Sequence, residues 1–351
     1  MIVDPITNPH ARLGGRRQAS FMEIREERQL NPVADDVSAL IAVTRPIVVG
    51  LLHSIGEEYL EPHGGRGNMR LADLGRVRKG SDGDLGVAFE YAVHDAVVNR
   101  EQVVIDRIVT ALKQCKVSGN SIASILFAIE KTGAKQLVET NRELITPDSR
   151  VLSGKRGQPV KLQGYMNQLA AAFHRPTARL ALPRSIQGLW KADLFLGSSS
   201  QDRWVGTSIK INPSRLESAP GLRVAIVPSS AQRSDIVRKD EQKNLVICPI
   251  PHDFSFMQTF FEGVRIVQML LSRDFHMPTA AELPNPLHRE VAKVYVERRE
   301  FKVQDVIDVL AVFAQPQLLT TTPEMVTTVG FSGSVEAGTS TALGPIPRLE
   351  I

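Results

Sequence analysis

The stretch from about residue 188 to residue 250 holds four short apolar runs separated by polar segments. LWKADLFLG and RWVGTSIKINP flank the turn GSSSQDR, and LRVAIVP and NLVICPIP flank the charged segment SDIVRKDEQKN. Short apolar runs bounded by turn residues are typical of strands. Apolar residues recur at helical spacing on both sides of this stretch, at 33–59, 85–113, 121–131, 133–143, 253–272, 287–300 and 303–314. The sequence therefore predicts an α/β protein.

Composition narrows the class of protein. With 351 residues and 42% hydrophobic content, the chain is long enough to bury a large core. Its longest apolar stretches, such as residues 47–52, are far shorter than the roughly 18 residues that a membrane-spanning helix needs, and its N-terminal segment lacks the apolar run of a secretory signal. Cys115 and Cys248 fit no zinc or disulfide pattern. We therefore expect a cytoplasmic protein with no membrane segment.

Three polar residues stand out in the first strand pair, which the GSSSQDR turn predicts to be a hairpin. Side chains alternate between the faces of a strand, so Ser208 and Lys210 share one face, while Thr207 and Ile209 share the other. Asp193 lies among apolar residues on the preceding strand, where a carboxylate needs a partner, a metal ion or an exposed strand end. Pairing of the two strands brings Asp193 and Lys210 together at the open end of the hairpin.

This arrangement resembles the PD-(D/E)xK nuclease superfamily, in which an Asp on one strand is followed, after a short turn, by a (Glu/Asp)-x-Lys tripeptide on the next. Upstream, LGVAFEYAVHDAVV resembles the first core helix of that superfamily, which often contributes a Glu, here Glu90. The resemblance covers mainly residues 85–100 and 188–250. It implies a restriction-endonuclease-like core with a central mixed sheet flanked by helices, plus helical elaborations.

The chain departs from the superfamily pattern at two positions. Ser208 stands where the pattern has Glu or Asp, and Ala192 replaces the Pro before Asp193. Some restriction enzymes of the superfamily also carry Ser in an S-x-K triplet and take the missing acid from a helix elsewhere. Glu90 is the first candidate for that acid and Glu217 the second.

The resemblance implies metal-dependent cleavage of DNA phosphodiester bonds. Glu90 and Asp193 would bind Mg²⁺, or Mn²⁺, because such cations prefer oxygen ligands. Lys210 would orient or deprotonate the attacking water and offset charge on the phosphate. The expected substrate is double-stranded DNA, in restriction or antiphage defence. Since many members act as dimers, we expect a homodimer or a subunit of a larger complex, with the helices after residue 285 as an interface.

The domain organisation follows from composition and from this resemblance. We expect a mobile arm at 1–32 with a short helix near 21–29, N-terminal helices and a basic loop at 33–84, a nuclease-like core at 85–275 with a helical insertion at about 115–185, C-terminal helices at 276–315 and an irregular tail at 316–351. The arm and the tail are rich in polar residues, Pro and Gly and have little to bury.

The candidate residues also have structural interpretations. An edge strand often carries a lysine that discourages aggregation, which would explain Lys210. Asp193 would then cap the hairpin or pair with Lys191 or Arg203. Glu90 fits equally well as a partly buried helical acid that pairs with an Arg.

Basic residues cluster in three places: Arg66, Arg70, Arg76, Arg78 and Lys79; Lys155, Arg156 and Lys161; His174, Arg175 and Arg179. Two of the clusters lie in the Gly-containing loops GGRGNMR and SGKRGQP, whose backbones can approach phosphates closely, which favours DNA contacts. Trp190 and Trp204 flank the strand pair and are interpreted as packing residues. His94 is interpreted as a core histidine and is left out of the catalytic set.

Two other functions stay open on the sequence. One is a non-catalytic nucleic-acid-binding or scaffolding protein that retains the nuclease fold, and the other is a soluble helical interaction protein in which the strand pair is incidental. No nucleotide-binding GxxxxGK[ST] loop, no GxGxxG turn after a strand, no HExxH and no GxSxG is present. The contact between Asp193 and Lys210, and a second carboxylate beside them, would distinguish these functions.

Overall fold

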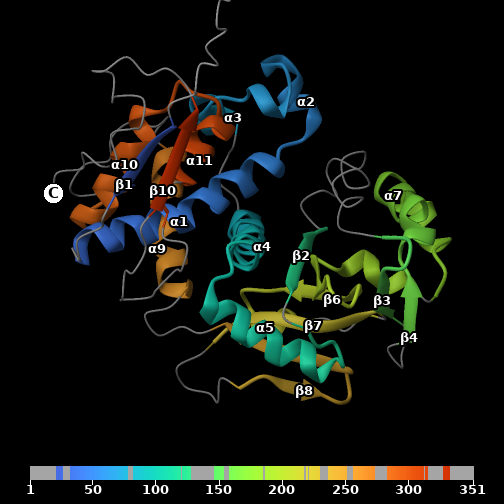
Figure 1. The fold of residues 1–351 in the computed structure, drawn as a ribbon. Helices are drawn as coiled ribbons and strands as arrows, with labels where there is room; N and C mark the ends of the chain where they lie inside the picture. Colours follow the sequence, from blue (N-terminus) through green and yellow to red (C-terminus); the bar gives the residue numbers. More distant parts are fainter. Residues whose placement is uncertain are drawn as a thin grey trace, which may run out of the picture.

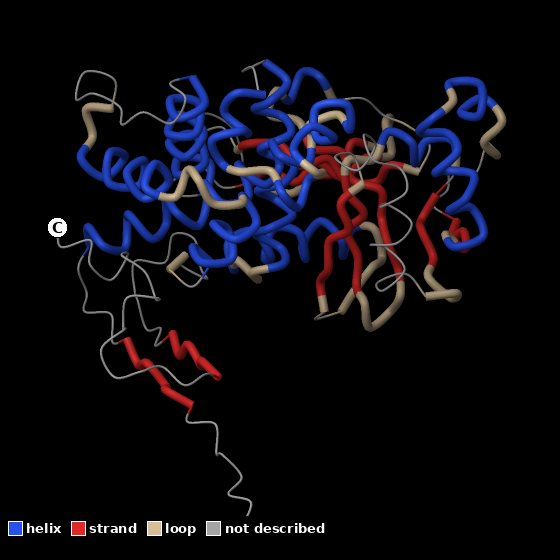
Figure 2. The backbone as a smooth tube through the Cα atoms, turned by 90° about the horizontal axis from the view of Figure 1, so that it is seen from above, coloured by secondary structure: helices blue, strands red, loops and turns tan. Residues whose placement is uncertain are grey.

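The computed structural model of the chain describes residues 21–26, 32–77, 82–119, 121–127, 146–153, 158–184, 186–216, 219, 221–229, 236–250, 256–272, 283–311, 313–314 and 327–332. A helical part and a sheet-bearing part lie side by side, as Figure 2 shows. The candidate site belongs to the sheet-bearing part.

The main sheet has eight strands, with the order β2-β5-β6-β7-β9-β8 and with β3 and β4 off this path (Figure 1). The strands are β2 (Ile122–Leu126), β3 (Arg150–Ser153), β4 (Gln158–Lys161), β5 (Leu194–Ser198), β6 (Arg203–Ile209), β7 (Leu222–Pro228), β8 (Arg238–Asp240) and β9 (Leu245–Ile250). β5 pairs antiparallel with β2 and β6, whereas β6, β7 and β9 run parallel. The fold is therefore α/β with an open mixed sheet flanked by helices, as the sequence predicted at this level.

The helices that the structure describes are α1 (Pro32–His53), α2 (Glu57–Leu60), α3 (Leu71–Val77), α4 (Asp82–Val98), α5 (Gln102–Gln114), α7 (Met166–His174), α8 (Pro176–Leu180), α9 (Phe256–Ser272), α10 (Pro286–Glu297) and α11 (Val303–Ala311). α1 packs against α4, α9, α10 and α11 and is one continuous helix despite Pro46. Its segment Asp36–His53 is long and apolar enough to cross a membrane, but 83% of it is buried inside the protein. Such burial is typical of a core helix.

The two faces of the sheet pack into different cores. Leu194 and Ile209 belong to a large core shared with the α4 side chain of Phe89. Phe195 and Trp204, which alternate with them along the strands, belong to a second core on the other face. Helices α4 and α5 therefore cover one face, and the segment that carries α7, α8 and a 3₁₀ turn at Gln187–Lys191 covers the other.

Part of the predicted organisation is wrong in the middle of the chain. Residues 122–126 form β2, where the sequence indicated a helix at 121–131, and residues 115–185 contribute three strands, so this segment is not a helical insertion. The reason is tertiary pairing, because β2 pairs along its whole length with β5. The helical pattern at 133–143 lies outside the described residues.

The ends of the chain also differ from expectation. Residues Phe21–Glu26 form strand β1, where the sequence indicated a short helix, and they pair antiparallel with β10 (Thr327–Ser332), within the tail that was expected to be irregular. Each strand supplies the backbone partners that the other lacks, which local sequence patterns do not reveal. Elsewhere, the helix predicted over 85–113 is two helices, because the chain turns at Arg100, whose φ of 59° is left-handed.

Candidate active site

The ends of β5 and β6 position Asp193. In the antiparallel pairing, Leu194 lies opposite Thr207, and the Asp193 backbone N–H donates to the Thr207 carbonyl at 2.8 Å. Asp193 therefore lies opposite Ser208, on the side of the sheet that also carries Phe195. β5 begins and β6 ends at this point, so the side chains here lie at the edge of the sheet where the hairpin is open.

One carboxylate oxygen of Asp193 collects three donors. Its Oδ2 accepts hydrogen bonds from the Ile209 backbone N–H at 2.7 Å, from Ser208 Oγ at 3.1 Å and from Lys210 Nζ at 3.2 Å. Within the described residues, no hydrogen bond to Oδ1 is present. The Asp193 side chain is 8% exposed, and a carboxylate so deeply buried needs such donors.

Lys210 is anchored at its backbone and exposed at its end. Its N–H donates to the Ile226 carbonyl on β7 at 3.0 Å, and its side chain is 35% exposed. Since β6 lies between β5 and β7, the edge-strand interpretation of Lys210 is wrong. The ion pair of Asp193 is formed with Lys210, so the expected contact at the open end of the hairpin is present.

Glu90 lies on α4, which packs against the opposite face of the sheet from Ser208. It is half-buried, and no hydrogen bond or ion pair between described residues joins it to Asp193. Glu217, the second candidate for the missing acid, lies outside the described residues. The structure thus brings together Asp193, Ser208 and Lys210, and the role of Glu90 stays a prediction.

The described site offers one carboxylate, that of Asp193, as a metal ligand. Among the residues that the structure describes, no group of three or more His, Cys, Asp or Glu side chains is placed to hold a metal ion. Mg²⁺, however, commonly keeps several waters and binds through one or two carboxylates together with substrate phosphates. Asp193 alone would supply only part of such a ligand set, and the binding of Mg²⁺ or Mn²⁺ stays a prediction.

His94 is a core histidine, as predicted. Its Nδ1 lies 3.0 Å from Ser124 Oγ on β2, and its ring contacts the edge of Tyr91, which stacks on His53. Burial lowers the pKa of His94 to about 4, and burial together with the charge of Arg66 does the same for His53. Both rings are therefore neutral at pH 7.

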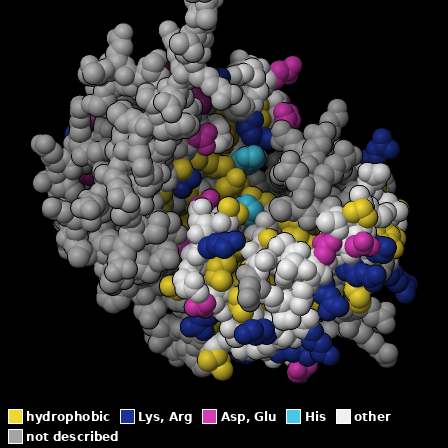
Figure 3. Space-filling model, in the orientation of Figure 1, with side chains coloured by type: hydrophobic (Ala, Val, Ile, Leu, Met, Phe, Trp, Pro, Cys, Tyr) yellow, Lys and Arg dark blue, Asp and Glu magenta, His cyan; other side chains and the backbone are white. Residues whose placement is uncertain are grey.

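Most described members of the basic clusters have local partners. Arg66 Nη2 lies 3.7 Å from Glu57, Arg70 Nη1 3.7 Å from Glu300, Arg76 Nη1 3.3 Å from Asp73 and Lys161 Nζ 3.4 Å from Asp148, while Arg179 donates to the Ala172 carbonyl. On the face shown in Figure 3, basic side chains are spread over the sheet-bearing part with acidic ones among them. The side chains of Arg78, Lys79, Lys155, Arg156 and His174 lie outside the described residues. These ion pairs weaken the positive field that phosphate binding would use.

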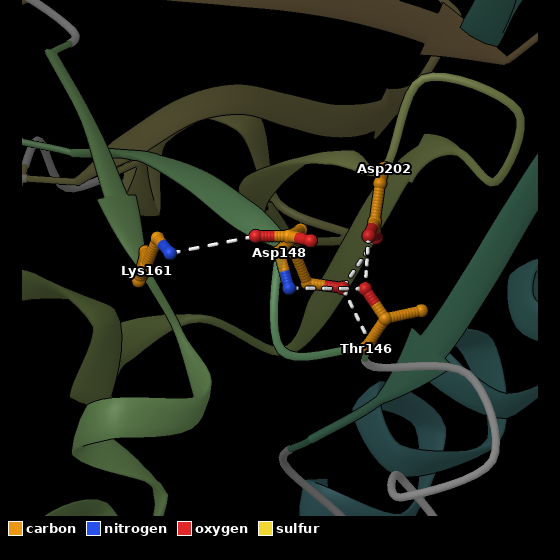
Figure 4. A network of polar contacts seen from close by, with 5 residues as sticks. Thr146, Asp148, Lys161 and Asp202 are labelled. Atoms are coloured by element: carbon orange, nitrogen blue, oxygen red, sulfur yellow. Dashed lines mark hydrogen bonds and ion pairs between the residues drawn. The ribbon is translucent and has the colours of Figure 1, made fainter.

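A polar cluster that the sequence did not indicate lies at the turn end of the same hairpin (Figure 4). Asp202 accepts hydrogen bonds from the hydroxyls of Thr146 and Ser149 and from Trp204 Nε1, the last at 3.3 Å. The Trp204 ring is fully buried, so its interpretation as a packing residue is confirmed. The side chain of Trp190 lies outside the described residues.

Comparison of the chain with protein families, with curated protein sequences and with solved structures finds no match. Function therefore has to be argued from the site.

Proposed function

We propose that this protein is a metal-dependent endonuclease that hydrolyses phosphodiester bonds of double-stranded DNA. The supporting observation is the 3.2 Å contact between Asp193 Oδ2 and Lys210 Nζ at the open end of two adjacent strands. The arrangement resembles the PD-(D/E)xK pattern in two further respects, because a helix bearing Glu90 precedes the strands and the sheet is mixed. A restriction-endonuclease-like core is part of the proposal.

The residues of the site divide the chemistry between them. Asp193 would hold Mg²⁺ or Mn²⁺, which, when bound, lowers the pKa of water and stabilises charge on the phosphate. Ser208 and the Ile209 N–H fix the carboxylate in one orientation. Lys210 would orient or deprotonate the attacking water and offset the negative charge that develops on the phosphate.

Glu90 is proposed as the second carboxylate. Two carboxylates that share a site repel each other, so a divalent cation between them should raise thermal stability. Glu90→Gln should remove most of the rise in Tm that Mg²⁺ causes, and Glu217→Gln is the matched control. A rise in Tm that survives Glu90→Gln but is lost in Glu217→Gln would move the assignment to Glu217.

The proposed setting is restriction or antiphage defence in the cytoplasm, with the protein acting as a homodimer or as a subunit of a larger complex. The C-terminal helices offer apolar surface for such contacts, since Phe301 is 59% exposed and Val309 on α11 is 42% exposed.

Nicking of supercoiled plasmid in Mg²⁺ or Mn²⁺ tests the proposal. The wild-type protein should nick, and Lys210→Ala should reduce the rate by about 10²-fold or more, because it removes charge stabilisation in the transition state. Lys239→Ala is the control, since Lys239 lies outside the basic clusters and pairs with Glu241 at 2.7 Å on the surface. If Lys210→Ala cuts plasmid at the wild-type rate, the assignment of a nuclease to this site is wrong.

The second candidate function is a non-catalytic nucleic-acid-binding or scaffolding protein with the same fold. The observation that favours it is the use of Asp193 Oδ2 as a cap for the backbone N–H of Ile209, a structural task that needs no metal. Binding of duplex DNA by a wild-type protein that never nicks it in Mg²⁺ or Mn²⁺ would support this alternative.

A further inference from the structure

The three donors on Asp193 Oδ2 differ in how firmly they are held. The Ile209 N–H is part of the backbone of β6, and Ser208 is 4% exposed on the same strand. Lys210 Nζ ends a long flexible side chain that is 35% exposed. Of the three donors, it is therefore the one that can swing out into water without any movement of the sheet.

We propose that Lys210 competes with the divalent cation for Asp193. In the protein without metal, the ammonium group of Lys210 neutralises the carboxylate. A divalent cation that binds Asp193 would displace Nζ from Oδ2. Lys210 would thus lower the affinity of the free site for the cation.

Electrostatic repulsion carries the competition. A cation bound to Oδ1 or Oδ2 would lie within a few ångströms of Nζ, because both positive groups would share one carboxylate. At such separations in a partly buried site, repulsion between charges is large compared with thermal energy. In the protein without metal, Lys210 Nζ already neutralises the charge of Asp193, so a cation that binds this carboxylate has to share it with Nζ or displace Nζ.

The displaced ammonium group of Lys210 could then bind a phosphate of the DNA. It would lie beside the cation and free of Asp193, where it can pair with a phosphate of bound DNA. Cation and DNA would then bind with positive coupling, since each removes an obstacle to the other. This inference rests on the proposed nuclease function and names how the site would be assembled.

Binding of Mn²⁺, followed by the electron paramagnetic resonance signal of the free ion, tests the inference without any cleavage. Lys210→Met should bind Mn²⁺ at least about five-fold more tightly than the wild type, because it removes the competing charge. Lys161→Met lowers the net charge equally at the exposed Asp148 pair and should bind as the wild type does. Lys210→Gln serves as a second variant in case the Met substitution impairs folding.

Three results would overturn the inference. One is an unchanged or weaker Mn²⁺ affinity in both folded Lys210 variants, and another is Mn²⁺ binding that is undetectable in every variant. The third is tighter binding that persists when Asp193→Asn is added to Lys210→Met, because the ion would then bind elsewhere. The nuclease function is tested separately, because plasmid nicking by the wild type does not depend on how the Mn²⁺ affinities of the variants compare.

Discussion

An aspartate lies at each end of the β5–β6 hairpin, and the two aspartates differ in how their hydrogen-bond donors are divided between the two carboxylate oxygens. At the open end, Asp193 takes three donors on Oδ2. At the turn end, Asp202 takes the Thr146 hydroxyl on Oδ2 and the Ser149 hydroxyl and the Trp204 indole on Oδ1. Both oxygens of Asp202 are therefore engaged, whereas the described contacts of Asp193 use one.

The difference separates a structural aspartate from a candidate ligand. The partners of Asp202 are neutral and tie the segment around Thr146 to the turn, so this carboxylate fastens two parts of the chain. Burial alone would raise the pKa of Asp202, but the hydrogen bonds from Ser149, Thr146 and Trp204 outweigh it and lower the pKa below 3.8. Asp193 instead pairs with a cationic side chain that can move away, and its Oδ1 accepts no hydrogen bond from the residues that the structure describes.

The largest effect should be the contrast in activity between the two aspartates. Asp193→Asn should slow plasmid nicking by about 10²- to 10³-fold, because an amide is a poor metal ligand and loses the charge that holds Lys210. Asp202→Asn should leave the rate within about three-fold, since it acts only through the turn. Rates measured on supercoiled plasmid check both. Equal losses of nicking rate in the two variants would mean that Asp193 is no more a metal ligand than Asp202 is.

The contact at the open end was predictable because it is local. Asp193 and Lys210 are 17 residues apart, so strand alternation and one turn were enough to place them together. The two hydroxyl donors of Asp202, on Ser149 and Thr146, lie 53 and 56 residues before it, and no pattern in the turn indicates them. A positive φ of 52° at Asp202 was the only local sign, and sequence does not display it.

The same reasoning explains what was right and wrong in the fold. Helices α9, α10 and α11 and strands β5, β6, β7 and β9 have strong periodicity of their own and were predicted. β2 was not, because its sequence IASIL fits a short helix equally well and its state is decided by pairing with β5, some 70 residues further along the chain. Whether Glu90 serves the site could not be predicted, because that depends on how α4 lies on the sheet.

The loss of folding stability in acid should come from buried histidines such as His94, which lie away from both ends of the hairpin. The pKa of His94 is about 4 in the folded protein and 6.5 ordinarily, so folding favours the neutral ring. This contribution is complete above pH 6.5 and is lost as the pH falls from 6.5 towards 4, by at most about 3 kcal/mol. Denaturant unfolding between pH 4 and 7 should show this slope together with a similar one from His53, and His94→Gln should remove the part that His94 contributes.

Asp202→Asn is the control for the acid prediction. Hydrogen bonds from Ser149, Thr146 and Trp204 hold the pKa of Asp202 below its ordinary value, so its stabilisation is lost only as the pH falls below about 5, and its removal should leave the slope between about pH 5 and pH 6.5 as it is in the wild type. A flatter slope in this variant would mean that the turn end takes part in the acid transition.

The two aspartate substitutions should affect the free energy of unfolding in the opposite order to their effects on nicking. Asp202→Asn removes the charge that accepts three hydrogen bonds and should cost about 1–3 kcal/mol of unfolding free energy. Asp193→Asn should cost less than about 1 kcal/mol, because the amide oxygen can still accept from Ile209 and because Lys210 can turn into water. Denaturation curves of the two variants check this order. A larger loss in Asp193→Asn would favour the structural interpretation of Asp193.

The smallest effects should come from single hydroxyls, one at each end. Ser208→Ala and Ser149→Ala each remove one hydrogen bond to a carboxylate that keeps other donors, so each should cost only about 0.5 kcal/mol of unfolding free energy. Only Ser208→Ala should also reduce nicking, by a few-fold, because Asp193 loses part of what orients it. Measuring stability and nicking for both variants separates these effects. If Ser149→Ala slows nicking as much as Ser208→Ala, the hydroxyl at the open end has no special part in orienting the ligand.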